Sequence, residues 1–288
     1  MSRNPRQELS QNILVGLGYI VFILFILFPI IWIFLMSIKE FRDIIAYPPV
    51  FVFKPTLANY ASILFGKDSG AGLTTGISDY LRFLRNSVII SSGAVLLSAL
   101  VGIPAAYALS RSNIRGRDTI AFTFLSFRFA PELTVILPLY AIFKRVGLYD
   151  TYPGLILANQ LITLPLVIWI MMSFFKEVPI EIEEAARMDG ASVWNTLIHI
   201  AIPIVRPGIA SALIIAFIFS WNNLLFGMVL GGSNTQPVTV GILQTMNFDQ
   251  IKWGWMAAAA MISALPGMCI AIYFQRYLVR GLTMGALK

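Results

Sequence analysis

The chain of 288 residues is poor in charge and in the residues that build disulfides and metal sites. Charged residues make up only 12% of it, whereas soluble domains are usually about 25% charged, so there is too little charge to cover a water-exposed globule. A single cysteine, Cys269, excludes a disulfide framework and a cysteine-built metal site. A single histidine, His199, excludes a site of several histidines. These shortages argue against a soluble enzyme.

Apolar residues dominate instead, at 58% of the chain with a mean hydropathy of +0.78. This composition is typical of an integral membrane protein and excludes intrinsic disorder, which requires low hydrophobicity. The net charge of +7 is assigned to basic residues that anchor loops on the cytoplasmic side. We expect no nucleic-acid partner, because the sequence shows no basic stripe with interleaved aromatic residues.

Six segments satisfy the length requirement for crossing a bilayer, which is about 20 mostly apolar residues. We therefore predict an all-α integral membrane protein with six transmembrane helices and both termini on the same side. The predicted spans cover residues 13–38, 87–110, 119–143, 151–175, 208–230 and 254–275. The first segment is too long for the apolar core of a signal peptide, and no cleavage site follows it, so we expect a retained helix.

The connections between the predicted spans differ in length and charge. Residues 1–12 and 277–288 form tails, residues 39–86 form a long loop, and residues 176–206 form a polar segment. Lys and Arg gather beside the tails and the 176–206 segment once the long loop is set aside, because long loops constrain topology least. By the positive-inside rule both termini and this segment are cytoplasmic, and the 39–86 loop is external.

The 176–206 segment has the pattern of a helix–turn–helix outside the membrane. Pro179 suits the first turn of a helix, and acidic residues crowd the N-terminal half, where the helix dipole favours anions. Asp189-Gly190 predicts the end of this helix, with glycine in the left-handed conformation. Ser192 can cap a second short helix, and the prolines from Pro203 onward break the chain before the fifth span.

Within this segment the sequence resembles a known motif. Glu184-Ala185-Ala186 is followed by Asp189-Gly190-Ala191 and, with nine residues between Gly190 and Ile200, by Ile200-Ala201-Ile202-Pro203. This spacing resembles the EAA motif of ABC importer permeases, with Ile202 where leucine, of similar volume, is common. On composition alone, a solvated hairpin whose acids merely keep it in water explains the segment as well; the full motif favours the permease.

The resemblance extends over most of the chain and is densest from Arg85 onward. The resemblance is to the six-helix member of a two-permease pair, and it places the permease core at residues 85–276. The stretches that carry it look like carbohydrate-importer permeases of the maltose-transporter type. They are Arg85-Asn86-Ser87, Gly147-Leu148-Tyr149-Asp150-Thr151, Trp221-Asn222 and the C-terminal Phe274–Lys288. The charged third span departs from the uncharged stretch of maltose-type members and favours a polyol or another sugar as cargo.

The resemblance implies a type I ABC importer permease of a bacterial or archaeal cytoplasmic membrane, surrounded by lipid. It implies three kinds of partner: a second, larger permease, two ATPase subunits and an external solute-binding protein. The chain has no G-x-x-x-x-G-K-[ST] loop, so ATP and magnesium belong to the ATPase subunits, and we expect neither a cofactor, a metal nor a catalytic residue here.

The same resemblance assigns the motif a coupling role at an ATPase subunit. Glu184 would pair with a basic residue there, Gly190 would allow the tight turn, and small side chains would permit close approach. The implied coupling residues are Glu184, Ala185, Ala186, Asp189, Gly190, Ala191 and Pro203.

Two charges fall near the middle of the third span. Arg128 and Glu132 are four residues apart and so share a helical face. A charge at mid-bilayer costs at least about 2.5 kcal/mol, so both should face protein or water. They form either a self-neutralising pair that fixes packing, or a substrate-path site where arginine donates to sugar hydroxyls and carboxylate accepts from them. Both readings stay open.

Other polar residues in the spans allow the same two readings. The Trp221 ring can stack on a sugar, and the amides of Asn159, Asn222 and Asn223 can bond its hydroxyls. Asparagine also commonly bonds between helices in lipid.

Three rival functions remain in view. An ion-driven secondary transporter predicts inverted repeats, which the sequence does not display. A membrane-embedded enzyme needs a cluster of reactive side chains, whereas Glu132 is the only acid in the predicted spans. An ABC importer for amino acids, peptides or phosphate would share the EAA motif, but the C-terminal resemblance favours carbohydrate.

Overall fold

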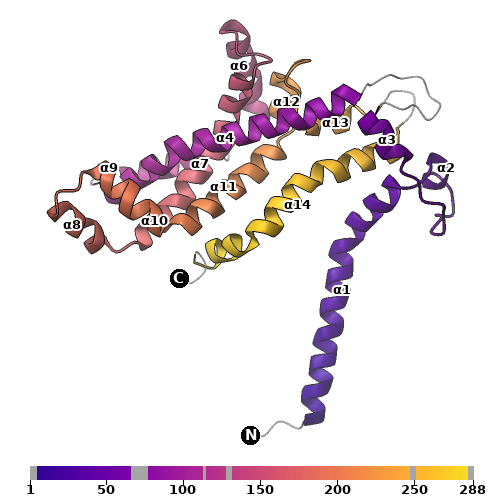
Figure 1. Ribbon diagram of the computed structural model, residues 1–288, viewed down its shortest axis with the longest axis horizontal. Coiled ribbons are helices and arrows are strands. Elements are labelled where there is room, and N and C mark those ends of the chain that lie inside the picture. The colour runs from indigo at the N-terminus through magenta and orange to yellow at the C-terminus, as the bar shows by residue number, and fades with distance from the viewer. Residues whose placement is uncertain (1–4, 66–76, 113–114, 128–131, 247–250, 285–288) are drawn as a thin grey trace. The chain divides into compact units, whose positions relative to one another are not determined.

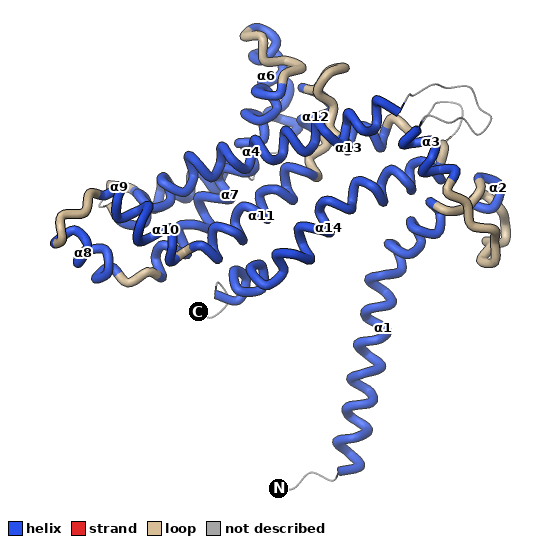
Figure 2. The backbone as a smooth tube through the Cα atoms, in the orientation of Figure 1, coloured by secondary structure: helices blue, strands red, loops and turns tan. Residues whose placement is uncertain are grey.

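The computed structural model describes residues 5–65, 77–112, 115–127, 132–246 and 251–284 (Figure 1). Within these ranges the chain is helical and forms no strand, as Figure 2 shows, which confirms the predicted all-α class. The helices are α1 (Pro5–Ser37), α2 (Phe41–Ile44), α3 (Ala58–Phe65), α4 (Ile77–Arg111), α5 (Arg117–Phe127), α6 (Glu132–Arg145), α7 (Tyr152–Glu177), α8 (Ile180–Met188), α9 (Val193–Thr196), the π-helical turn η1 (Leu197–Ala201), α10 (Ile202–Ile204), α11 (Arg206–Trp221), α12 (Leu225–Leu230), α13 (Val238–Leu243) and α14 (Trp253–Met284).

Two compact units make up the chain. The first contains residues 1–78 and 242–262, and therefore α1, α2, α3 and the first turns of α14. The second contains residues 79–241 and 263–288. In the second unit α7 packs along α11 and against α5, and α12 packs against α6 and α7.

Among the described residues, four helical stretches are long and apolar enough to cross a membrane: Leu14–Ser37, Tyr80–Arg111, Tyr152–Glu177 and Trp253–Ile270. They overlap the first, second, fourth and sixth predicted spans. The predicted third span contains α5 and α6, but residues 128–131 between these helices lie outside the described residues. The count of six spans therefore stays a prediction.

The predicted fifth span, residues 208–230, is not one continuous helix as the sequence suggested. Helix α11 ends at Trp221 and α12 begins at Leu225. Asparagine explains the interruption, because its side chain competes with the backbone for hydrogen bonds. Asn223 Oδ1 accepts from the Phe226 N–H at 2.9 Å and so caps α12. The Asn222 amide donates back to the Ile218 carbonyl at 2.8 Å.

The predicted break before the fifth span is present. The helical stretch Val193–Ile204 and the helix Arg206–Trp221 meet at 82°. Val205, between the two, lies outside regular helix geometry, with φ −89° and ψ 11°. Prolines on either side, Pro203 and Pro207, lack the N–H that a continuous helix would use.

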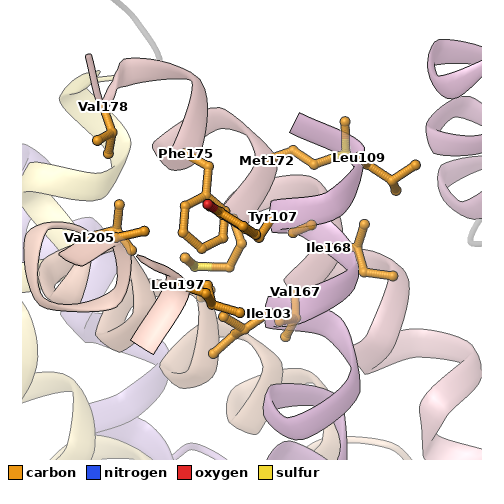
Figure 3. Close-up of a cluster of buried hydrophobic side chains, with 14 of the residues drawn as sticks. Ile103, Tyr107, Leu109, Val167, Ile168, Met172, Phe175, Val178, Leu197 and Val205 are labelled. Carbon is orange, nitrogen blue, oxygen red and sulfur yellow. The ribbon is translucent and has the colours of Figure 1, made fainter. Parts of the chain in front are cut away.

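A buried apolar cluster lies where α4, α7 and the turn η1 meet (Figure 3). The Tyr107 and Phe175 rings pack edge to face, with centroids 5.3 Å apart. Leu197 from η1 and Val205 are 3% exposed and close the cluster from the other side. Because the cluster joins the ends of α4 and α7 to η1, it fixes the base of the hairpin that follows α7.

Candidate functional site

The hairpin formed by α8 and α9 has the local structure that the sequence predicts. Gly190 adopts φ +89°, in the left-handed region. The turn closes through the Gly190 N–H, which donates to Arg187 O at 3.0 Å, and the Ala191 N–H, which donates to Ala186 O at 2.9 Å. Ser192 Oγ accepts from the Asn195 N–H at 3.3 Å and so caps α9.

The predicted coupling residues lie on and around this turn. Glu184, Ala185, Asp189 and Gly190 are exposed. Ala186, Ala191 and Pro203 are half-buried. The hairpin therefore presents two acids, Glu184 and Asp189, and small side chains to the outside.

A different acid, Glu183, connects the hairpin to the helices behind it. Its carboxylate is 1% exposed and accepts from Arg111 Nε at 2.9 Å and from the Tyr107 hydroxyl at 2.8 Å. Arg111 Nη2 also donates to the Val178 carbonyl at 2.6 Å. The Arg111–Glu183 ion pair thus joins the last residue of α4, the end of α7 and the first turn of α8.

Sequence reasoning missed this role of Glu183. The sequence pattern explains the acids of α8 together, as favourable to the helix dipole, and nothing local separates Glu183 from Glu184. The distinguishing signal is a partner 72 positions away in sequence, which spacing within one chain does not reveal. A cavity of about 340 Å³ adjoins the ion pair and is lined by residues including Tyr107, Arg111, Arg187 and Trp194.

Glu132, one of the two predicted mid-membrane charges, begins α6 and is half-buried. Its Oε2 accepts from Asn223 Nδ2 at 3.1 Å. The Asn223 carbonyl accepts in turn from the Thr239 hydroxyl at 3.1 Å. The structure thus brings together Glu132 and Asn223 from two predicted spans, whereas Arg128 lies outside the described residues.

The other predicted substrate-path residues are mostly packed between helices. Asn159 is 3% exposed and accepts from the Ser220 hydroxyl at 3.0 Å. Trp221 is 5% exposed, and its Nε1 donates to the Ser263 carbonyl at 3.1 Å. Only Asn222 is exposed. The cavity between Asn159 and Asn223 measures about 10 Å³, roughly the room that one water molecule needs, so this conformation leaves no space there for a sugar.

A second hydrogen-bonded centre surrounds Asp150, at the start of α7. The residue adopts φ 55°. Its carboxylate accepts from the Thr235 hydroxyl at 2.8 Å, the Asn234 amide at 2.8 Å and the Gly232 N–H at 2.9 Å. Burial acts to raise the pKa of Asp150, but these hydrogen bonds outweigh it and hold the pKa below its usual value.

The same region, residues 231–237, is also hydrogen-bonded to Asn86 in the N-terminal third of α4. Asn86 Nδ2 donates to the carbonyls of Asn234 and Gln236 at 2.9 and 3.0 Å. Asn86 Oδ1 accepts from the Tyr152 hydroxyl at 2.8 Å. The stretches around Asn86 and Asp150, both noted for their resemblance, therefore converge on one loop, a role that their sequence positions did not indicate.

Comparison with known proteins places this geometry among transporters. A family model described as binding-protein-dependent transport system inner membrane component matches residues 94–284. The chain is 33% identical to the trehalose/maltose transport system permease protein MalG of Thermococcus litoralis, over 98% of this chain and 99% of that protein. It is 32% identical to the trehalose transport system permease protein SugB of Mycobacterium tuberculosis, over 91% and 92%.

Among solved structures, one chain of a bacterial ABC transporter involved in the import of the acidic polysaccharide alginate superimposes with a TM-score of 0.75. The match covers 96% of this chain and 99% of that one at 23% identity. It confirms the expected ABC importer permease fold.

Proposed function

The chain belongs to the family of binding-protein-dependent transport system inner membrane components, and on that premise we propose that it is one of two permease subunits of an ATP-driven importer for a sugar or sugar alcohol. One observation carries the cargo class: relatives aligned over nearly the whole chain are permeases of trehalose/maltose and trehalose transport systems. The polar side chains available in its spans, which are amides, hydroxyls and a carboxylate, suit hydroxyl-rich cargo.

The proposed partners follow from what the chain contains. It has no phosphate-binding loop for ATP, so two ATPase subunits bind ATP and magnesium and hydrolyse the nucleotide. An external solute-binding protein delivers the solute, in keeping with the family description. A second, larger permease completes the path through a bacterial or archaeal cytoplasmic membrane, with both termini of this chain in the cytoplasm.

We assign the coupling step to the exposed face of the α8–α9 hairpin. Glu184 and Asp189 are exposed acids on either side of Ala185 and Ala186, a surface suited to close approach by a basic groove on an ATPase subunit. The pair Arg111–Glu183 behind this face ties the hairpin to α4 and to the end of α7. A push on the hairpin therefore reaches two predicted spans and biases a two-state equilibrium between inward-open and outward-open forms.

We propose that the substrate path includes Glu132 with Asn223, which already bond each other. Asn222 and Arg128 extend this path. Asn159 and Trp221 pack between helices in this conformation, so they reach solute only after the helices move apart, as alternating access requires.

Reconstitution tests the proposed function. The chain, its second permease and the ATPase subunits are placed in proteoliposomes with the external binding protein, and uptake is measured across a panel of sugars and polyols. We expect uptake that needs both ATP and the binding protein. Uptake driven by an ion gradient without ATP would instead support a secondary transporter, and uptake of amino acids or phosphate alone would change the cargo class.

Topology is tested separately by labelling with a membrane-impermeant thiol reagent. Ser69→Cys and Ser192→Cys are each made in a Cys269→Ala background, since Cys269 is exposed. Intact cells should label the first and not the second. Labelling of Ser192→Cys without permeabilisation would remove the basis for an ATPase contact at the hairpin.

A further inference from the structure

A polar cavity of about 430 Å³ lies in the first unit, where two predicted spans end. The apolar stretch of α1 ends at Ser37, and that of α14 begins at Trp253. The cavity is lined by Lys39, Glu40, Phe41, Arg42, Thr56, Ala58, Asn59, Lys252, Gly254 and Trp255. Its volume is within the range of roughly 300–1,000 Å³ that is usual for small-ligand sites.

The buried charge in this cavity is the ammonium group of Lys252. Its Nζ is buried and has no hydrogen-bond partner among the described residues. The ammonium nitrogen lies 3.6 Å from the centre of the Trp255 ring. The ring face attracts the cation, but it does not accept conventional hydrogen bonds from the three N–H groups of the ammonium. A buried ammonium is unfavourable unless an acceptor, preferably an anion, compensates it.

The rest of the lining contributes two basic side chains, Lys39 and Arg42, one exposed acid, Glu40, and fixed walls. Lys39 holds one wall in place, because its Nζ donates to the Val50 carbonyl at 2.6 Å and lies over the Phe53 ring. Arg42 is 86% exposed at the side chain and is 3.8 Å from Asp43. At Gly254 a Cβ would lie 2.6 Å from Asn59 Oδ1, so the absence of a side chain lets α3 approach α14 here.

We propose that this cavity binds the phosphate of an anionic phospholipid headgroup, with Lys252 as its main ligand and Arg42 at its rim. The position favours a lipid over a solute, because both helices that lead into the cavity leave their apolar stretches there. The segment between α2 and α3 also exposes Tyr47 and Phe51, at 97% and 69%. Aromatic residues at the ends of spans are typical of the headgroup layer on both sides of a membrane.

Native mass spectrometry of the whole transporter, purified in detergent with added phosphatidylglycerol, measures the binding. Lys252→Met removes the charge and keeps the length, and a lost charge-assisted hydrogen bond should weaken binding about tenfold to a hundredfold. Lys252→Arg should retain binding. Lys54→Met is the matched control, because Lys54 is exposed in the same unit and outside the cavity lining, and its binding should equal the wild type. Equal binding by Lys252→Met and wild type would overturn the site.

Thermal stability in nanodiscs separates the possible sources of the anion. Wild-type transporter should melt at a higher temperature in phosphatidylglycerol than in phosphatidylcholine, and Lys252→Met should lose this difference. Equal stabilisation by inorganic phosphate in phosphatidylcholine would overturn the assignment to lipid. Weaker binding of the external solute-binding protein to the Lys252→Met variant in phosphatidylcholine would also overturn the assignment to lipid. It would show that the cavity binds a carboxylate of that protein.

Discussion

Arg111, the last residue of α4, donates from Nε to Oε1 of Glu183 in α8 across 2.9 Å. Both side chains are buried, at 9% and 1% exposure, and Arg111 also holds the Val178 carbonyl beyond the end of α7. The contact is therefore a rigid joint between the hairpin and two long helices. Because the hairpin itself exposes Glu184 and Asp189, the structure separates an acid that faces inward from acids that face outward.

Removing one partner of the Arg111–Glu183 ion pair should lower the stability of the fold. Glu183→Ala leaves the Arg111 guanidinium buried without its carboxylate, and such a change typically costs about 3–5 kcal/mol. Replacing both partners, as Arg111→Met with Glu183→Leu, removes the ion pair more cleanly and should restore most of the stability. We expect the double variant to assemble and hydrolyse ATP while uptake falls, because the hairpin no longer moves with α4. Normal uptake in a well-folded double variant would make the pair merely structural.

Reversing the charge of Glu184, which is exposed on the hairpin, should have a different effect. Glu184→Lys should leave insertion and stability near wild type, because Glu184 is exposed and exposed substitutions usually change stability by about 0.5 kcal/mol or less. It should nonetheless lower uptake at least about tenfold, since like charges brought together at an interface cost several kcal/mol. The control is Glu181→Lys on the same helix, also exposed. Equal losses in the two variants would point to general charge rather than to the coupling surface.

Substitutions of Gly190 should act through the left-handed backbone conformation that this residue adopts. Its φ of +89° lies where a residue with a Cβ is strained, and no atom within 4 Å would meet an added Cβ, so crowding plays no part. Gly190→Val should cost about 1–3 kcal/mol in the turn and lower uptake. Gly190→Asn should lose less, because asparagine tolerates the left-handed region. Uptake and ATP hydrolysis measured on both variants check the order; equal tolerance of valine would contradict it.

Local features of this hairpin were predictable from sequence, and long-range ones were not. The left-handed Gly190 and the Ser192 cap depend on neighbours within three or four residues, which the sequence displays directly. The partners of Glu183, Asp150 and Asn86 lie far away along the chain, so only the fold reveals them. The break after Trp221 is an intermediate case, since Asn222-Asn223 carries a local signal that the surrounding apolar run concealed.

Asp150 should make the 231–237 loop sensitive to acid. Its pKa is lower in the folded protein than the value of about 3.9 expected in an unfolded chain. A depressed folded pKa means that the stabilisation is fully present above the unfolded value and is lost as the pH falls through the folded pKa. Wild-type stability should therefore fall as the pH drops below about 4. Asp150→Asn, which tolerates a positive φ, should be less stable at pH 7 and should lack this contribution to the acid sensitivity. Melting temperatures of both proteins across that pH range test it.

The last prediction concerns Arg128 and Glu132, for which two readings remain. Glu132 already bonds Asn223 at 3.1 Å, so a test must remove both charges without stranding that amide. Arg128→Met with Glu132→Gln does so, because glutamine keeps an acceptor oxygen and no buried charge is left unpaired. If the pair serves packing, this double variant should transport normally. If, as we expect, it binds hydroxyl-rich solute, uptake should fall by about tenfold or more, since hydrogen bonds to charged groups are worth about 1.5–3 kcal/mol. ATP hydrolysis and assembly should stay at wild-type levels, and Asn222→Ala on the exposed side of the same region should lower uptake in the same direction. Full uptake in the double variant would show that the pair is structural.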